Sequence, residues 1–258
     1  MKSPLIAIEI FSTYFVNGKR VLLPKRMASC TPDTRSALFK ISNDVEAAGG
    51  NLFLSDLFRS YDMQLQSHLD FVNKKKKAFS PPPGGSLHEA GRAIDLDLDG
   101  LGMSLKDFWP IATQHGFFPI ISTPNSKMSE AWHFDCRGSH NVVYEYYVDG
   151  KGTNMKPYQA MAASAILAIG VQVDRFGANQ NAAAIQAGLI RLGNELGNID
   201  GSIGKKTRDA LEQAGVPFGE PAATLSAVED LLRQKFPDEY TAGTADEFSV
   251  VVPGHVIP

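Results

Sequence analysis

Residues 86–95 read SLHEAGRAID, and residues 129–135 read SEAWHFD. Each segment sets histidine and carboxylate side chains in a short polar stretch within otherwise apolar sequence. The first segment runs into AIDLDLD, where acidic and aliphatic residues alternate, so Asp95 and Asp97 are expected on one face of a strand. The second segment is also predicted to be a strand. A polar strand face beside a polar loop is typical of a functional site.

Four side chains of these segments can carry out metal-assisted hydrolysis. His88, Asp95 and His133 form a catalytic zinc set, because two imidazoles and one carboxylate leave a fourth position for water. A bound zinc ion lowers the pKa of such water to about 7. A nearby carboxylate that is not a ligand must accept the proton of the water and pass it to the leaving amine, and Glu130 is the candidate. We therefore predict about one Zn²⁺ per chain.

The spacing of these residues resembles that of a zinc peptidase family that cuts the peptide part of bacterial peptidoglycan. The family comprises D-Ala-D-Ala carboxypeptidases, vancomycin-resistance-type D,D-peptidases and phage L-alanyl-D-glutamate endopeptidases. Its pattern is Ser-x-His-x-x-Gly-x-Ala-x-Asp, followed later by Glu-x-x-His, often with Trp before that His. The matching positions in this chain are Ser86, His88, Gly91, Ala93, Asp95, Glu130, Trp132 and His133. The resemblance implies the same three metal ligands, with Glu130 as the general base.

Upstream, residues 57–64 read LFRSYDMQ and resemble the family's Tyr-Arg-Ser segment, with Phe58 where tyrosine is common. In the family, this arginine reaches the carbonyl or carboxylate of the substrate. The resemblance therefore assigns Arg59 to stabilising charge on the tetrahedral intermediate. A planar guanidinium that is always charged suits this role.

Other polar residues near these segments are expected to have supporting roles. Ser86, Trp132 and Asp97 are predicted to contact the substrate or to orient the metal ligands. Asp97 and Asp135 are interpreted as partners of the ligands or as solvated carboxylates, not as extra ligands. The remaining histidines are predicted to be structural or exposed, and they are His68, His115, His140 and His255.

The spacing of the polar residues in the segment 129–135 constrains its backbone conformation. Glu130 and His133 are three residues apart, so on one regular strand their side chains would face opposite sides. Both can reach one metal ion only if the chain bends around Ala131 and Trp132, or if the strand begins no earlier than Trp132.

Helical periodicity marks two stretches between the N-terminus and the first segment. Residues 34–48 are predicted to form one helix, and a second carries Leu65, Leu69 and Val72. The second helix ends in four lysines, residues 74–77, which are interpreted as a solvated helix end and not as a binding patch.

Composition limits the function classes. The chain has 258 residues, of which 43% are hydrophobic and 21% charged, with a formal net charge of −3. Neither nucleic acid nor an anionic membrane is implied by this charge, and no apolar run is long enough to span a bilayer. The N-terminal MKSPLIAIEIFSTYFV is interrupted by Glu9 and lacks a small-residue cleavage site, so a first strand is expected there. Cys30 and Cys136 are expected to be buried thiols, with one disulfide as the alternative.

Three regions follow from the change in composition along the chain. Residues 1–155 are predicted to form an α+β zinc peptidase domain, in which helices flank a small antiparallel sheet. Residues 156–235 are predicted to form a small all-α domain. Residues 236–258 lose the periodicity and are expected to be an extended tail or an edge strand.

The helical region resembles a small peptidoglycan-binding module. Its hallmarks are Leu-Gly, then Gly-x-Ile-Asp-Gly, then Gly-x-x-Thr-x-x-Ala. They are matched by Leu192, Gly193, Gly197, Ile199, Asp200, Gly201, Gly204, Thr207 and Ala210. The resemblance implies a wall anchor that raises the local concentration of an insoluble substrate, and a purely structural appendage is the alternative.

These patterns favour hydrolysis of a D-amino-acid-containing bond of the stem peptide, in the manner of a D-Ala-D-Ala carboxypeptidase. An L-Ala-D-Glu endopeptidase of endolysin type fits the same motifs. A non-catalytic zinc-containing wall-binding protein would need no base such as Glu130, and an ordinary proteinase or dipeptidase would leave the C-terminal module unexplained. The substrate places the activity at the cell wall, periplasmic or extracellular, although no export signal is recognisable. Residues 1–155 are expected to keep the metal and to cleave a small soluble peptide without the rest.

Overall fold

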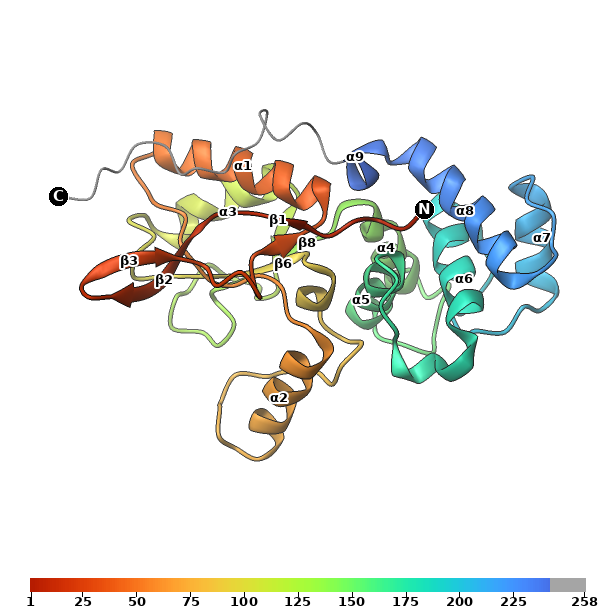
Figure 1. Cartoon of the computed structure of the whole chain (residues 1–258), viewed down its shortest axis with the longest axis horizontal. Coiled ribbons are helices and arrows are strands. Elements are labelled where there is room, and N and C mark those ends of the chain that lie inside the picture. Colours follow the sequence, from red (N-terminus) through yellow and green to blue (C-terminus); the bar gives the residue numbers. More distant parts are fainter. Residues whose placement is uncertain (242–258) are drawn as a thin grey trace.

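The computed structural model describes residues 1–241, and the segment 242–258, which includes His255, lies outside the described residues. Figure 1 shows a sheet with α1 and α3 at one end of the molecule and a group of helices at the other. The strands are β1 (Ile6–Ala7), β2 (Phe11–Val16), β3 (Lys19–Leu22), β4 (Ser29–Cys30), β5 (Leu54–Asp56), β6 (Ala93–Leu96), β7 (Phe117–Pro119) and β8 (His133–Cys136). The longer helices are α1 (Pro32–Ala47), α2 (Tyr61–Val72), α3 (Leu105–Gln114), α4 (Asn141–Val148), α5 (Pro157–Ala168), α6 (Gln180–Leu192), α7 (Lys205–Gln213) and α8 (Pro221–Lys235). Shorter helical turns are η1 (Leu87–Ala90), η2 (Gly138–His140), η3 (Asp174–Asn179) and α9 (Pro237–Tyr240).

The main sheet has six strands in the order β3-β2-β5-β6-β8-β7. Its neighbouring strands are antiparallel except β2 and β5, which are parallel. The small antiparallel sheet that the sequence predicts is thus confirmed, with one parallel pair. The single N-terminal strand is divided into β1, which pairs with β4, and β2, and the buried Ile8 and Ile10 lie between them.

The two predicted helices differ in the burial of their regularly spaced apolar side chains. Helix α1 turns Leu38, Ile41 and Val45 into the core beneath it, and all three are 0% exposed. Helix α2 forms as expected, but Leu69 and Val72 are 41% and 55% exposed. Figure 1 shows α2 projecting from the body of the molecule. The periodicity therefore predicted a helix correctly, whereas the apolar stripe of α2 is not a core face.

Two hydrophobic cores hold the fold together. One lies between the sheet, α1 and α3. The other is formed by α4 to α8 together with Leu87, Ala90 and Ala93 of η1 and β6. Helices α4 to α8, called the helical region below, therefore pack directly on η1 and β6, which carry two of the predicted metal ligands. The expected domain boundary at residue 155 lies between α4 and α5, which share this core.

The region expected to be an extended tail begins with helix α9. Its Glu239 is 2% exposed and forms a buried ion pair with Arg191 of α6. The backbone carbonyl of Glu239 also accepts a hydrogen bond of 2.9 Å from the hydroxyl of Ser3. These contacts join the start of the chain, α6 and α9.

Two further sequence expectations concern cysteines and membranes. Cys30 and Cys136 are buried free thiols, and burial raises the pKa of Cys136 to about 12. Among residues 1–241, no helix has the length and apolar character needed to cross a bilayer.

Candidate metal centre

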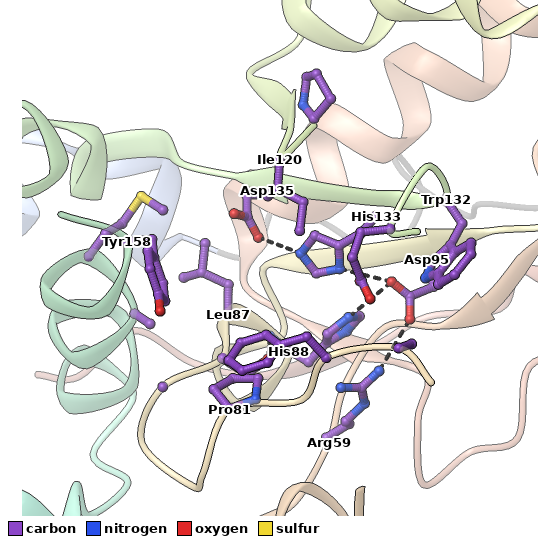
Figure 2. Close-up of a pocket in the computed structure, with 18 of the residues that line it drawn as sticks. Arg59, Pro81, Leu87, His88, Asp95, Ile120, Trp132, His133, Asp135 and Tyr158 are labelled. Atoms are coloured by element: carbon purple, nitrogen blue, oxygen red, sulfur yellow. Dashed lines mark hydrogen bonds and ion pairs between the residues drawn. The ribbon is translucent and has the colours of Figure 1, made fainter. Parts of the chain in front are cut away.

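Three side chains from η1, β6 and β8 converge on one point (Figure 2). One ligand atom from each of His88, Asp95 and His133 lies within 4.8 Å of the other two. Oδ1 of Asp95 is 3.3 Å from Nε2 of His88 and 2.9 Å from Nδ1 of His133. Metal–ligand bonds of about 2.0–2.1 Å in a tetrahedron require ligand atoms about 3.3 Å apart. The three residues therefore fit one small divalent cation.

The local sequence explains how η1 presents His88. The hydroxyl of Ser86 accepts a hydrogen bond from the His88 N–H, and the carboxylate of Glu89 accepts one from the Ser86 N–H, which closes a capping box. Gly91 ends the turn with φ 61°, and a Cβ there would lie 2.8 Å from Cα of Cys30. Only glycine fits between η1 and β6 at this point.

Hydrogen bonds orient both imidazoles toward the metal position. Nδ1 of His88 donates to the carbonyl of Leu57 at 2.8 Å, so Nε2 is left for the metal. Nε2 of His133 lies 2.9 Å from Oδ1 of Asp135, which leaves Nδ1 for the metal. Burial lowers the pKa of His133, but the carboxylates of Asp135 and Asp95 outweigh burial and raise it to about 10. Asp135 thus contacts a candidate ligand, and it is not one of the three grouped residues.

Asp135→Asn should weaken metal binding without removing a ligand. The amide cannot stabilise the positive charge that the His133 ring gains on metal binding, so the affinity for Zn²⁺ should fall by about 10-fold to 100-fold. Competition with a chromogenic chelator measures this affinity. Asp97→Asn is the matched control and should bind Zn²⁺ as the wild type does, because Asp97 pairs with Arg20 at 2.9 Å outside this group. Equal affinities for Asp135→Asn and the wild type would contradict the orienting role.

The backbone departs from a regular strand at Glu130, just before β8. This residue has φ 67°, β8 begins only at His133, and the His133 N–H donates to the Glu130 carbonyl at 3.0 Å. Both side chains therefore face one cavity. Oε1 of Glu130 is buried and has no hydrogen-bond partner within residues 1–241. Burial raises the pKa of Glu130, the charge of His133 lowers it, and Asp95 raises it further. An unpaired carboxylate with a raised pKa beside a metal position suits a general base.

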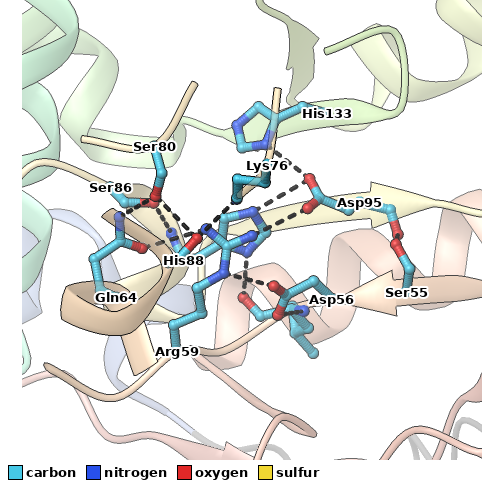
Figure 3. Close-up of polar contacts among 12 residues, drawn as sticks. Ser55, Asp56, Arg59, Gln64, Lys76, Ser80, Ser86, His88, Asp95 and His133 are labelled. Carbon is cyan, nitrogen blue, oxygen red and sulfur yellow. Dashed lines mark hydrogen bonds and ion pairs between the residues drawn. The ribbon is translucent and has the colours of Figure 1, made fainter. Parts of the chain in front are cut away.

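Arg59 lies directly beside the metal ligands (Figure 3). Its Nε donates to Oδ2 of Asp56 at 2.5 Å, and its Nη2 donates to Oδ2 of Asp95 at 3.2 Å. Nη1 donates to Oε1 of Gln64 at 3.3 Å, and Gln64 is the one fully buried residue of α2. The guanidinium thus fixes Asp95 and lines the cavity. Asp56 and Gln64 were not predicted to take part in the site, although both lie within five residues of Arg59.

The cavity at this group has a volume of about 490 Å³ and is lined by both ends of the molecule. Ser86 and Trp132 line it, whereas Asp97 does not. Lys76 also lines it and donates to the hydroxyl of Ser67 at 2.8 Å, so this lysine is not part of a solvated helix end. From the helical region, the lining residues are Tyr144, Pro157, Tyr158, Met161 and Ala162. No local sequence pattern indicated this contribution, since it depends on packing between distant segments.

The remaining described histidines lie outside the cavity and contact protein groups. Nδ1 of His68 is 2.8 Å from the carbonyl of Ser80, and Nε2 of His115 is 2.6 Å from the carboxylate of Asp44. His140 is buried, with Nδ1 2.9 Å from the hydroxyl of Ser164. These contacts agree with the structural roles predicted for the three residues.

Fold and site together define, within residues 1–241, a mixed α/β protein with a candidate metal centre of two histidines and an aspartate. No family model and no curated protein matches the sequence. Among solved structures, the LdcB LD-carboxypeptidase is similar with 18% identity and a TM-score of 0.38, over 51% of this chain and 66% of that chain. The L,D-carboxypeptidase DacB from Streptococcus pneumoniae is similar with 23% identity and a TM-score of 0.33, over 52% of this chain and 85% of that chain. DacB from Streptococcus pneumoniae D39 gives 21% identity and a TM-score of 0.33, over 50% of this chain and 84% of that chain.

Proposed function

We propose that the protein is a zinc-dependent peptidase that hydrolyses a D-amino-acid-containing bond of the peptidoglycan stem peptide, in the manner of a D-Ala-D-Ala carboxypeptidase. The observation that carries this proposal is the convergence of His88, Asp95 and His133 in one cavity with the unpaired carboxylate oxygen of Glu130. Metal-assisted hydrolysis needs these two parts, a ligand set with an open position and a base that is not a ligand. The choice of peptidoglycan rests on the sequence motifs, and it places the activity at the cell wall.

Different residues of the cavity have different roles in the proposed hydrolysis. His88, Asp95 and His133 would hold Zn²⁺, which when bound polarises the substrate carbonyl and lowers the pKa of water. Glu130 accepts the proton of the attacking water and delivers it to the leaving amine. Arg59 places a fixed positive charge beside the reacting carbonyl, where it stabilises the negative charge of the tetrahedral intermediate.

Metal removal and product analysis test this proposal. Protein purified without added metal should contain about one zinc per chain, should lose peptidase activity in excess chelator, and should regain it when Zn²⁺ is restored. Digestion of purified sacculi and of a synthetic stem pentapeptide, followed by mass analysis, identifies the bond that is cut. Release of D-alanine supports the carboxypeptidase reaction, and cleavage after L-alanine supports the endopeptidase instead. Full activity of the metal-free protein, or no cleavage of either substrate by the zinc-loaded protein, would contradict the proposal.

A further inference from the structure

Arg137 follows strand β8 and lines the same cavity as the metal ligands. Its guanidinium carbon lies 4.7 Å from the centroid of the Phe118 ring and 4.1 Å from that of the Tyr144 ring. One ring comes from β7 and the other from α4, so the guanidinium is held by aromatic contacts from both ends of the molecule. Such contacts stabilise the cation and fix its plane, while its N–H groups remain directed outward from that plane's edge.

In the part of the chain that the structure describes, the charge of Arg137 has no acidic partner. Within residues 1–241, none of the ion pairs involves this residue, although Arg59 in the same cavity pairs with both Asp56 and Asp95. Nη1 of Arg137 makes one long hydrogen bond of 3.4 Å to Asn141, and its Nε is buried without a partner in the described part of the chain. A partly buried cation with unused N–H groups can form a charge-assisted, bidentate pair with a carboxylate that enters the cavity.

Tyr158 adds a second donor to the lining of the same cavity. It lies on α5 and its side chain extends toward the cavity in Figure 2. Its hydroxyl forms no hydrogen bond among residues 1–241 and is free to donate. Arg137 and Tyr158 thus line the same cavity as His88, Asp95, His133, Glu130 and Arg59, and Tyr158 comes from helix α5.

We propose that Arg137, assisted by Tyr158, binds a carboxylate of the substrate peptide that is not part of the scissile bond. This inference rests on the proposed peptidase function and narrows its substrate class to peptides with a free carboxylate close to the bond that is cut. The stem peptide offers two such groups, the C-terminal carboxylate and the carboxylate of its D-glutamate. Arg137 is thus a specificity residue, and it takes no part in proton transfer.

Amidated peptides test this inference. The probes are a stem pentapeptide, the same peptide amidated at its C-terminus, and the same peptide amidated at its glutamate. For the wild type, one of the two amidations should lower kcat/KM by about 10-fold to 100-fold, as expected for loss of a hydrogen bond to a charged group. Arg137→Gln should lower kcat/KM for the free pentapeptide by the same factor and show no further loss on that amidated peptide. The amidation that matters identifies the carboxylate.

Controls separate failure of this inference from failure of the proposed function. Lys76→Gln removes another cation of the cavity and should keep the wild-type preference between free and amidated peptides. If Arg137→Gln fails to fold, Arg137→Lys takes its place and should reduce the preference, because an ammonium lacks the planar fork. An unchanged preference in the folded variant, or a wild type indifferent to both amidations, overturns the inference. Failure of the zinc-loaded wild type to cleave any of the three peptides overturns the proposed function itself.

Discussion

Glu130→Gln should lower the rate of stem-peptide hydrolysis by about 10²-fold to 10⁴-fold, the usual contribution of a general acid-base residue. Glutamine keeps the shape of the side chain but cannot accept the proton of the attacking water. Zinc content should remain at the wild-type level, because the ligand atoms of His88, Asp95 and His133 are unchanged. The measurements are kcat on a synthetic stem peptide and elemental analysis of the same preparation.

An exposed glutamate provides the matched control for this change. Glu46 lies on α1 away from the cavity, so Glu46→Gln should leave both kcat and zinc content unchanged. If Glu130→Gln hydrolyses the peptide at the wild-type rate, another group transfers the proton. The non-catalytic alternative would become favoured only if the wild type itself were inactive with zinc bound.

The core shared by η1, β6 and the helices replaces the expectation from sequence that residues 1–155 suffice for activity: a chain that ends at residue 155 should lose both zinc binding and activity, even on a small soluble peptide. Truncation removes α5 to α8, against which Leu87, Ala90 and Ala93 are packed. The turn that holds His88 would then expose apolar surface to water and lose its support. Truncation also deletes Tyr158 and Met161 from the cavity wall. Circular dichroism, thermal unfolding and zinc titration of the truncated chain measure these losses.

A milder change distinguishes loss of the fold from loss of the cavity wall. Tyr158→Ala leaves the buried core of the helices in place, since Tyr158 is 37% exposed. This variant should fold, bind zinc as the wild type does, and show a raised KM. If residues 1–155 keep their zinc and cleave the soluble peptide normally while losing activity on sacculi, the helical region acts only as an anchor through effective concentration.

The sequence was most informative where local spacing determines local geometry. Helical spacing predicted α1, whose Leu38, Ile41 and Val45 are buried. The spacing of Glu130 and His133 required a bend around Ala131 and Trp132 or a late strand start, and β8 begins at His133, after left-handed backbone at Glu130. Local spacing could not predict that Leu69 of α2 is exposed, because exposure depends on which segment packs nearby. The cavity positions of Arg137 and Tyr158 could not be predicted either. They depend on contacts between β7, α4, α5 and η1, which are distant in the sequence.

The left-handed backbone at Glu130, with φ 67°, has a consequence for attempts to engineer the protein. An L-residue in this conformation costs roughly 1–2 kcal/mol, which glycine does not incur. A laboratory selection for heat resistance alone would therefore favour glycine at residue 130 and enrich inactive variants. Selection rounds that alternate heat challenge with a peptide-cleavage screen avoid this outcome, because stability and turnover make opposite demands on the same position.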